Sequence, residues 1–239
     1  MSEEKQPKKM FDASVASAVA IRLVDALSDH CEMIDICGSL RRCRPSVHDI
    51  DIVLSPKLTE IVAPSAQASL FAPAAIPFWK GFSVIKEFFT DFVVPVTGYQ
   101  MFDDTSDKLK GCKFDFENEK SKVSLDTGLD DYINRKVNLV LTDKTGRGAP
   151  WDGLPVELYI CEPLRYEMVR FIRTGSKEHN VKIATTARNR GMKIHADGLG
   201  FSSLKNPSIF LNVTSEEMLF DRLQMKYVPP EEREDKGEF

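Results

Sequence analysis

The residues best placed to do chemistry are two aspartates, Asp49 and Asp51, separated by a single isoleucine. The surrounding run, residues 48–54, predicts a β-strand, in which side chains alternate between two faces. Both carboxylates would lie on one face, and the aliphatic residues between and after them would be buried on the other. Two neighbouring negative charges repel, so a fold keeps such a pair mainly where a cation lies between them. Because Mg²⁺ binds carboxylate oxygens and shares its coordination with substrate phosphates, the pair indicates a site for metal and phosphate.

A turn that could bind an anion lies just before this strand. Gly38 and Ser39 follow an apolar run and precede two arginines, Arg41 and Arg42. A tight turn here would direct backbone N–H groups at an anion, and the guanidinium groups would add charge-assisted hydrogen bonds. Each feature alone is common on protein surfaces. Their order within one short segment predicts a site for the phosphates of a nucleotide and a metal ion.

This arrangement resembles the nucleotidyltransferase motif G-S-x-R-R-(x)-D-x-D of the DNA polymerase beta superfamily, and specifically of its family X polymerases. Residues 171–180 are similar to the family X segment Y-F-T-G-S-x-x-x-N, and residues 225–234 to the family ending Y-x-P-P-E-x-R-E. The resemblance covers residues 31–54 and 154–239, at two separated places that follow the family order.

The resemblance implies nucleotidyl transfer assisted by two ions, Mg²⁺ or Mn²⁺. Asp49, Asp51 and Glu157 are the catalytic and metal-binding residues that it implies. Glu157 lies in a predicted strand where family X polymerases usually have aspartate, and its extra methylene still allows metal ligation. The nucleotide-binding residues that it implies are Gly38, Ser39, Arg42, Thr174, Gly175 and Asn180.

Other positions bear on substrate choice. Asn180 matches the family asparagine that touches the minor-groove edge of the nucleotide base. Ile172 and Arg173 replace a pair of aromatic residues implicated in excluding the ribose 2′-hydroxyl, so the choice between dNTP and NTP stays open. His48 replaces a glycine that is common before the first aspartate, and we interpret it as a neutral structural residue.

The predicted fold is α+β: a nucleotidyltransferase palm, with a mixed β-sheet and helices on one face, and a small α/β thumb. The palm is expected over residues 1–165, with an insertion at about 56–135, and the thumb-like domain over residues 166–239. A helix capped by Asp12 or Ser14 is predicted over residues 10–28. The sequence also predicts a short helical turn over residues 40–44, strands over 33–37, 136–141 and 155–160, a helix over 181–190 and a helix from residue 214. Within the insertion it predicts a helix over residues 81–92 and a strand over residues 113–123.

Composition indicates an ordinary globular chain. It has 239 residues, 42% of them hydrophobic and 28% charged, and no apolar run near the roughly 20 residues of a membrane span. The five cysteines lack metal-site spacing and suggest reduced thiols. We therefore expect a soluble, intracellular (cytoplasmic) protein without membrane contact, and its small size would suit a phage or virus. The net charge of −4 argues against strong nonspecific affinity for DNA.

We therefore expect a minimal family X-like DNA polymerase of palm and thumb alone. It would add nucleotides from a nucleoside triphosphate to the 3′-hydroxyl of a DNA primer/template or gapped DNA, releasing pyrophosphate. One alternative is a nucleotidyltransferase with another acceptor (RNA, tRNA, a protein or a small molecule), which the acidic composition favours. A second is a catalytically silent nucleotide- or DNA-binding protein, against which the three retained acids argue. Template dependence, oligomeric state and protein partners stay open.

Overall fold

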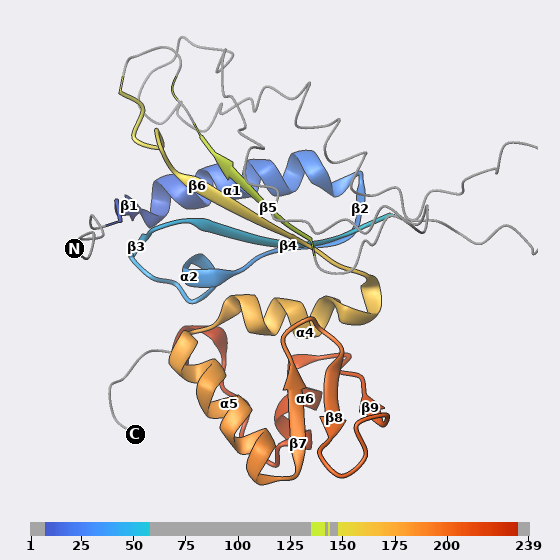
Figure 1. Ribbon diagram of the computed structural model, residues 1–239. Helices are drawn as coiled ribbons and strands as arrows, with labels where there is room; N and C mark the ends of the chain where they lie inside the picture. Colours follow the sequence, from blue (N-terminus) through green and yellow to red (C-terminus); the bar gives the residue numbers. More distant parts are fainter. Residues whose placement is uncertain (1–7, 58–134, 142, 144–147, 234–239) are drawn as a thin grey trace, which may run out of the picture.

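The computed structural model describes residues 8–57, 135–141, 143 and 148–233, and Figure 1 shows their arrangement. The helix predicted over residues 81–92 and the strand predicted over residues 113–123 lie outside the described residues. No described helix has the length and apolar character needed to cross a membrane.

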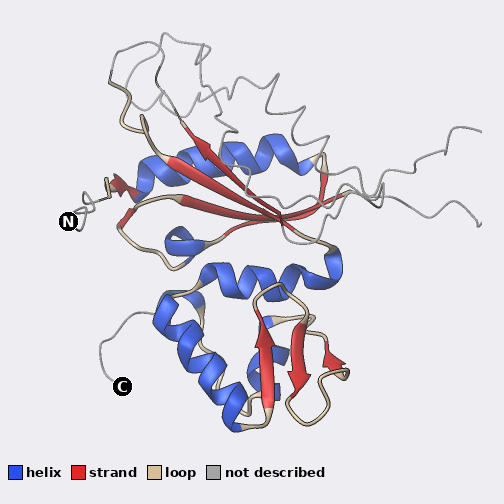
Figure 2. Ribbon diagram, in the orientation of Figure 1, coloured by secondary structure: helices blue, strands red, loops and turns tan. Residues whose placement is uncertain are grey.

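A four-stranded mixed sheet forms the centre of the N-terminal part (Figure 2). Its order is β2 (Cys31–Ile36), β4 (Ile50–Pro56), β6 (Pro155–Ile160) and β5 (Arg135–Val140). The two central strands, β4 and β6, run parallel, and both outer pairings are antiparallel. This confirms the mixed sheet predicted from the sequence. It also places the strand that follows Asp49 directly beside the strand that carries Glu157.

The first helix, α1 (Ala13–Ser28), begins three residues later than predicted. Phe11 and Asp12 are extended instead and form the short strand β1, which pairs with β3 (Ser46–Val47). Asp12 is the N-cap, as one of the two predicted choices, because its side chain accepts a hydrogen bond from the backbone of Ser14. The strand pair and the cap together fix where the helix starts.

Helices cover both faces of the sheet, whereas the sequence predicted helices on one face. The aliphatic residues of β4 that were predicted to be buried pack under α1. On the opposite face, Val53 and Tyr159 pack against α4 (Pro163–Thr174) through Tyr166 and Val169. Because β4 is apolar on both sides, it needs a second covering layer, and α4 supplies it (Figure 1).

The C-terminal part has its own core. Helix α4 leads to α5 (Lys177–Asn189) and α6 (Glu216–Arg222), which pack with a small antiparallel sheet around a second hydrophobic cluster. Met168 and Phe171 of α4 belong to that cluster. One helix therefore serves both cores, and the predicted domain boundary after residue 165 falls within it; that boundary stays a prediction. The remaining elements are α2 (Gly38–Arg41), β7 (Met192–His195), β8 (Gly200–Ser203), β9 (Phe210–Leu211) and η2 (Pro230–Glu232).

Helix α5 starts four residues earlier than predicted. The hydroxyl of Ser176 accepts a hydrogen bond from the backbone N–H of His179, so the segment after Gly175 is already helical. Asn180 consequently lies on the first turn of α5 rather than in a loop. The helix ends before Gly191, whose φ of +73° is the left-handed conformation that glycine adopts readily.

Candidate nucleotide and metal site

The turn at Gly38 is built around Asp51. Gly38 has a φ of +60°, and the backbone N–H of Cys37 donates to the carbonyl of Asp51 at 2.7 Å. A Cβ on residue 38 would lie 1.9 Å from the Asp51 carboxylate, so a side chain cannot fit there without displacing that group. Glycine is required here both for the backbone conformation and for this close approach.

Three carboxylates face one another at the end of the two central strands. Asp51 of β4 pairs in register with Glu157 of β6, and Asp49 immediately precedes β4. Burial raises the pKa of Asp51 to about 7, and the negative charges of Asp49 and Glu157 add to the effect. Burial and the charge of Glu157 also raise the pKa of Asp49. The sequence-predicted acids therefore interact, as an electrostatic cluster.

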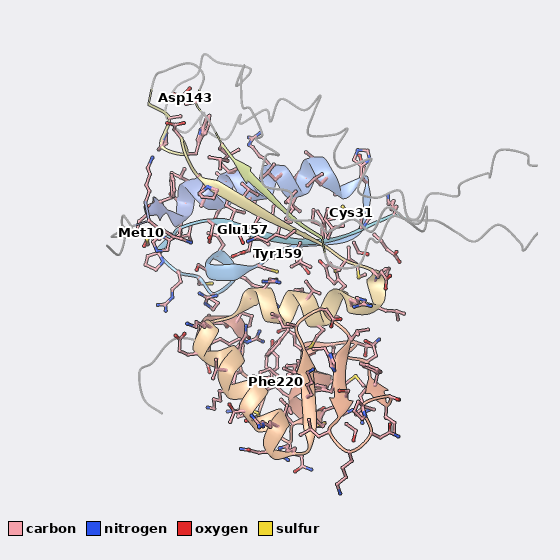
Figure 3. The ribbon with its side chains drawn as sticks, viewed as in Figure 1. Met10, Cys31, Asp143, Glu157, Tyr159 and Phe220 are labelled. Carbon is pink, nitrogen blue, oxygen red and sulfur yellow. The ribbon has the colours of Figure 1, made fainter. Side chains whose placement is uncertain are left out.

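Glu157 is restrained by two neighbours that sequence reasoning did not single out. The Lys136 ammonium lies 2.6 Å from its carboxylate, and the hydroxyl of Tyr159 donates to the same oxygen. Although burial opposes it, these hydrogen bonds lower the pKa of Glu157. Glu157 and Tyr159 lie close together on β6 (Figure 3), two residues apart and therefore on one face of the strand. The two-residue spacing from Glu157 was the sequence signal that could have identified Tyr159 as a neighbour of that acid.

The donor set fits a hard divalent cation, but it is not gathered around one point. Among residues 8–57, 135–141, 143 and 148–233, no group of three or more His, Cys, Asp or Glu side chains is close enough to hold a metal ion. Mutual repulsion at Asp49 and Asp51 is the electrostatic condition that a cation relieves. Glu157 is the acid that is paired with a cation of the chain, Lys136. The residues therefore fit the predicted ions chemically, with Glu157 needing to exchange its partner.

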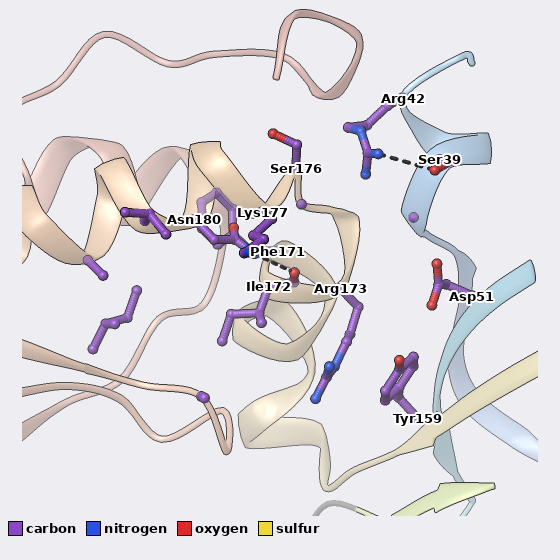
Figure 4. Close-up of a pocket in the computed structure, with 16 residues that line it drawn as sticks. Ser39, Arg42, Asp51, Tyr159, Phe171, Ile172, Arg173, Ser176, Lys177 and Asn180 are labelled. Atoms are coloured by element: carbon purple, nitrogen blue, oxygen red, sulfur yellow. Dashed lines mark hydrogen bonds between the residues drawn. The ribbon is translucent and has the colours of Figure 1, made fainter. Parts of the chain in front are cut away.

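A cavity of about 640 Å³ joins the two halves of the chain (Figure 4). Ser39, Arg42 and Asp51 line it from the sheet side, and Gly175 and Asn180 line it from the C-terminal side. These residues are more than 120 positions apart in the sequence, yet they were predicted to act on one nucleotide. At its far end, the cavity is lined by residues that are apolar or small: Ile172, Val181, Ala184, Ile194 and Ala196.

Arg42 links the two walls of this cavity. Its guanidinium donates to the hydroxyl of Ser39 at 3.2 Å and to the backbone carbonyl of Thr174. A Cβ on Gly175, whose φ is +69°, would lie 3.1 Å from the same guanidinium. The cationic end of the cavity therefore brings together predicted nucleotide-binding residues from both halves.

Two predicted nucleotide-binding residues have structural partners. Thr174 is fully buried and does not line the cavity; its hydroxyl donates to the carbonyl of Arg170 at 2.7 Å. Asn180 does line the cavity, but its amide nitrogen donates to the carbonyl of Ile172 at 2.8 Å. His48 lies 3.1 Å from the carbonyl of Lys9, in keeping with the structural role predicted for it.

A buried ion-pair network joins the turn to the C-terminal part, and sequence reasoning missed it. Arg41 donates to the hydroxyl of Thr174 at 2.6 Å and to the carboxylate of Glu216 at 2.5 Å. The other oxygen of Glu216 accepts from the buried Arg233 at 2.5 Å. Burial opposes ionisation of Glu216, but the hydrogen bonds from Arg233 and Arg41 lower its pKa. Sequence reasoning predicted only a helix from residue 214 here, and the N-cap of that helix is Ser215.

A comparison with known families finds a match in the C-terminal part of the chain. Residues 170–234 match the family model described as DNA polymerase beta thumb. The matched range runs from α4 to η2 and contains Gly175 and Asn180 of the cavity wall. No curated protein matches the chain. The chain therefore carries a polymerase beta-type thumb domain on an α+β fold, consistent with a family X polymerase-like protein.

Replacing Gly38 by alanine should destabilise the fold more than the same change at Gly153. Both residues have positive φ, but nothing lies within 4 Å of a Cβ on Gly153. We expect G153A to cost about 1–2 kcal/mol of backbone strain, and G38A to cost about 1–3 kcal/mol more from crowding of Asp51. Urea unfolding measures both. Equal losses would show that the Gly38–Asp51 contact is not a constraint.

Amide substitutions of Asp51 and Glu157 should change stability in opposite directions. The raised pKa of Asp51, about 7 against an ordinary 3.8, means that its ionisation destabilises the fold increasingly as the pH rises through that range. D51N should therefore exceed wild type by about 2–4 kcal/mol at pH 8, with the difference shrinking toward pH 4. The lowered pKa of Glu157 means that its stabilisation is present above its ordinary pKa and lost on acidification. E157Q should be less stable than wild type at pH 8 only.

Urea unfolding in EDTA between pH 4 and pH 8 measures both differences. The two variants serve as controls for each other, because each removes one negative charge from the same cluster. A D51N protein less stable than wild type at pH 8 would contradict the electrostatics described.

Proposed function

We propose that the protein is a family X-like DNA polymerase, which adds nucleotides to a 3′-hydroxyl by phosphoryl transfer and releases pyrophosphate. The observation that carries the proposal is the shared cavity. It is lined by the Gly38–Ser39 turn and Asp51 from the sheet and by Gly175 and Asn180 from the thumb-type domain. A nucleotide has an anionic end and an apolar base, and the cavity offers a cationic end and an apolar end in one space.

In this proposal the phosphates lie at the cationic end. Ser39 and Arg42 would bind the β- and γ-phosphates, because a hydroxyl and a guanidinium fork supply donors suited to phosphate oxygens. Lys177 lines the same cavity and adds a further positive charge. The base would lie against the apolar end, and Gly175 allows the backbone to approach the sugar closely.

Asp49, Asp51 and Glu157 would hold two divalent cations, whose chemistry is to lower the pKa of the attacking hydroxyl and to neutralise charge on the phosphates. The contribution of the chain itself is to hold the three acids near one another, with Asp51 on the cavity wall, where bound cations would favour the ionised carboxylates that burial and repulsion disfavour. Arg173 lines the cavity and stacks on the ring of Tyr159 at 4.1 Å, so it places a fixed positive charge near the acids.

A local basic surface supports a nucleic-acid acceptor despite the net charge of −4. Helix α5 and the strand after it expose Lys182, Arg188, Arg190 and Lys193, whereas Glu178 is the single acidic residue between positions 177 and 193. Exposed positive side chains on elements that also contribute residues to the cavity suit the phosphates of a DNA strand.

Primer extension with D51N tests the proposed reaction. Wild-type protein with Mg²⁺ or Mn²⁺ should extend a primer on gapped or primed DNA, and D51N should lose at least about 1,000-fold in rate because a charged group at the reacting phosphate is removed. D25N, which changes an exposed acid of α1, should extend at the wild-type rate. Undiminished extension by D51N would contradict the assignment.

The same assay separates the other candidate functions. Extension of RNA or tRNA, with none of DNA, would favour a nucleotidyltransferase with another acceptor. Nucleotide binding without turnover on any acceptor would favour a catalytically silent binding protein. Parallel reactions with dNTPs and NTPs, on gapped duplex and on single strands, would define the sugar preference and template dependence.

A further inference from the structure

Lys136 lies beside the cluster of acids formed by Asp49, Asp51 and Glu157. It lies on β5, the edge strand next to β6, and its register partner on β6 is Tyr159. Its ammonium contacts the carboxylate of Glu157 at 2.6 Å and lies 5.5 Å from the centre of the Tyr159 ring. A positive charge from a neighbouring strand therefore already neutralises the third acid, whose own charge acts on both Asp49 and Asp51.

We propose that Lys136 is a resident counter-ion of Glu157, which a divalent cation must displace before Glu157 can join Asp49 and Asp51. This inference rests on the proposed function, since it concerns the same acids. It makes Lys136 a positioning residue: it is not among the residues that line the cavity, and it acts through the carboxylate that it binds.

The Lys136–Glu157 contact is suited to exchange. The Lys136 side chain is 41% exposed and that of Glu157 is 23% exposed, so the pair is partly screened by solvent. Exposed ion pairs contribute little net free energy, and a lysine ammonium sits on a flexible stem with no fixed geometry. A buried arginine, such as Arg233 beside Glu216, would bind its acid far more rigidly.

Tyr159 can contact both Glu157 and Lys136 after a divalent cation has displaced the ammonium from the carboxylate. Its hydroxyl donates to Glu157, so the carboxylate stays oriented when the ammonium leaves. Its ring lies within reach of Lys136, so a displaced ammonium can remain against an aromatic face. Arg173 already stacks on that ring at 4.1 Å. The Tyr159 ring thus contacts both cationic side chains, while its hydroxyl donates to Glu157.

The consequence is a lower affinity for divalent cations than the three acids alone would provide. Removing the ammonium should tighten cation binding, because the competing charge is lost while Asp49, Asp51 and Glu157 remain. The gain should depend on Glu157, since that acid is the group for which the two cations compete.

Mn²⁺ binding, followed by electron paramagnetic resonance of the free ion without nucleotide or DNA, tests the inference. K136M keeps the aliphatic stem and should lower the Kd for Mn²⁺ by about 2- to 5-fold, the range expected for a partly exposed pair. The matched control is K205M, which changes an exposed lysine of the thumb-type domain and should leave the Kd unchanged. In an E157Q background, K136M should produce a smaller gain.

An unchanged Kd in K136M, or a gain of full size in the E157Q background, would overturn the role of Lys136 and leave the proposed function standing. The D51N variant distinguishes failure of the proposed metal site from failure of the role of Lys136. A wild-type Kd in D51N would remove the proposed metal site itself and this inference with it, whereas a weakened Kd in D51N together with tighter binding by K136M would support both.

Discussion

The buried carboxylate of Glu216 is the interaction on which the geometry of the site depends. It joins Arg41, next to the Gly38–Ser39 turn, to Arg233 near the end of the described chain. Arg41 also reaches Thr174, so the turn and the end of α4 are fixed to each other. Removing one member of such a network leaves a buried charge without compensation, which costs far more than an exposed pair contributes.

This network explains why neighbouring arginines have different tasks. Arg41 points into the joint between the two halves, whereas Arg42 lines the cavity and contacts Ser39. The sequence presents them as an equivalent basic pair. The structure separates them into a residue that holds the walls together and a residue that faces the proposed phosphates. Either substitution would therefore affect nucleotide binding, but only loss of Arg41 would leave Glu216 without its sheet-side partner.

A second constraint is the repulsion among the three acids. Burial and mutual charge raise the pKa values of Asp49 and Asp51, so ionisation of these acids destabilises the fold at the place where the proposed chemistry occurs. Lys136 compensates part of that charge through Glu157. Active sites commonly retain such local electrostatic cost because it becomes binding free energy for cations or substrate.

Local sequence patterns predicted much of the fold because strand alternation and helix capping depend on residues that are close together in the sequence. The alternation around Asp51 identified the buried face of β4, and strand β6 begins and ends at the residues predicted. The cap at Asp12 followed from hydrogen-bond chemistry. Helix α5 was placed too late because the cap at Ser176 was not recognised. The two-sided cover of the sheet depended on tertiary packing of α4, which periodicity alone does not specify.

The site was predicted in part for the same reason. Residues within a motif, such as Gly38 and Asp51, were found together because their spacing carries the signal. Glu216 and Lys136 were missed because their partners lie far away in the sequence, and an isolated charged residue resembles any surface charge. Thr174 matches the motif yet is buried against Arg170, so motif identity did not decide which way its side chain faces.

The central claim, that the turn and the thumb-type domain bind one nucleotide together, is tested most directly by amide hydrogen exchange. The protein would be compared with and without a non-hydrolysable nucleoside triphosphate and Mg²⁺. Simultaneous protection is expected in residues 38–42 and 175–180, two segments that contribute lining residues to opposite walls of the cavity. Protection of one segment alone, or of neither at a saturating nucleotide concentration, would contradict it.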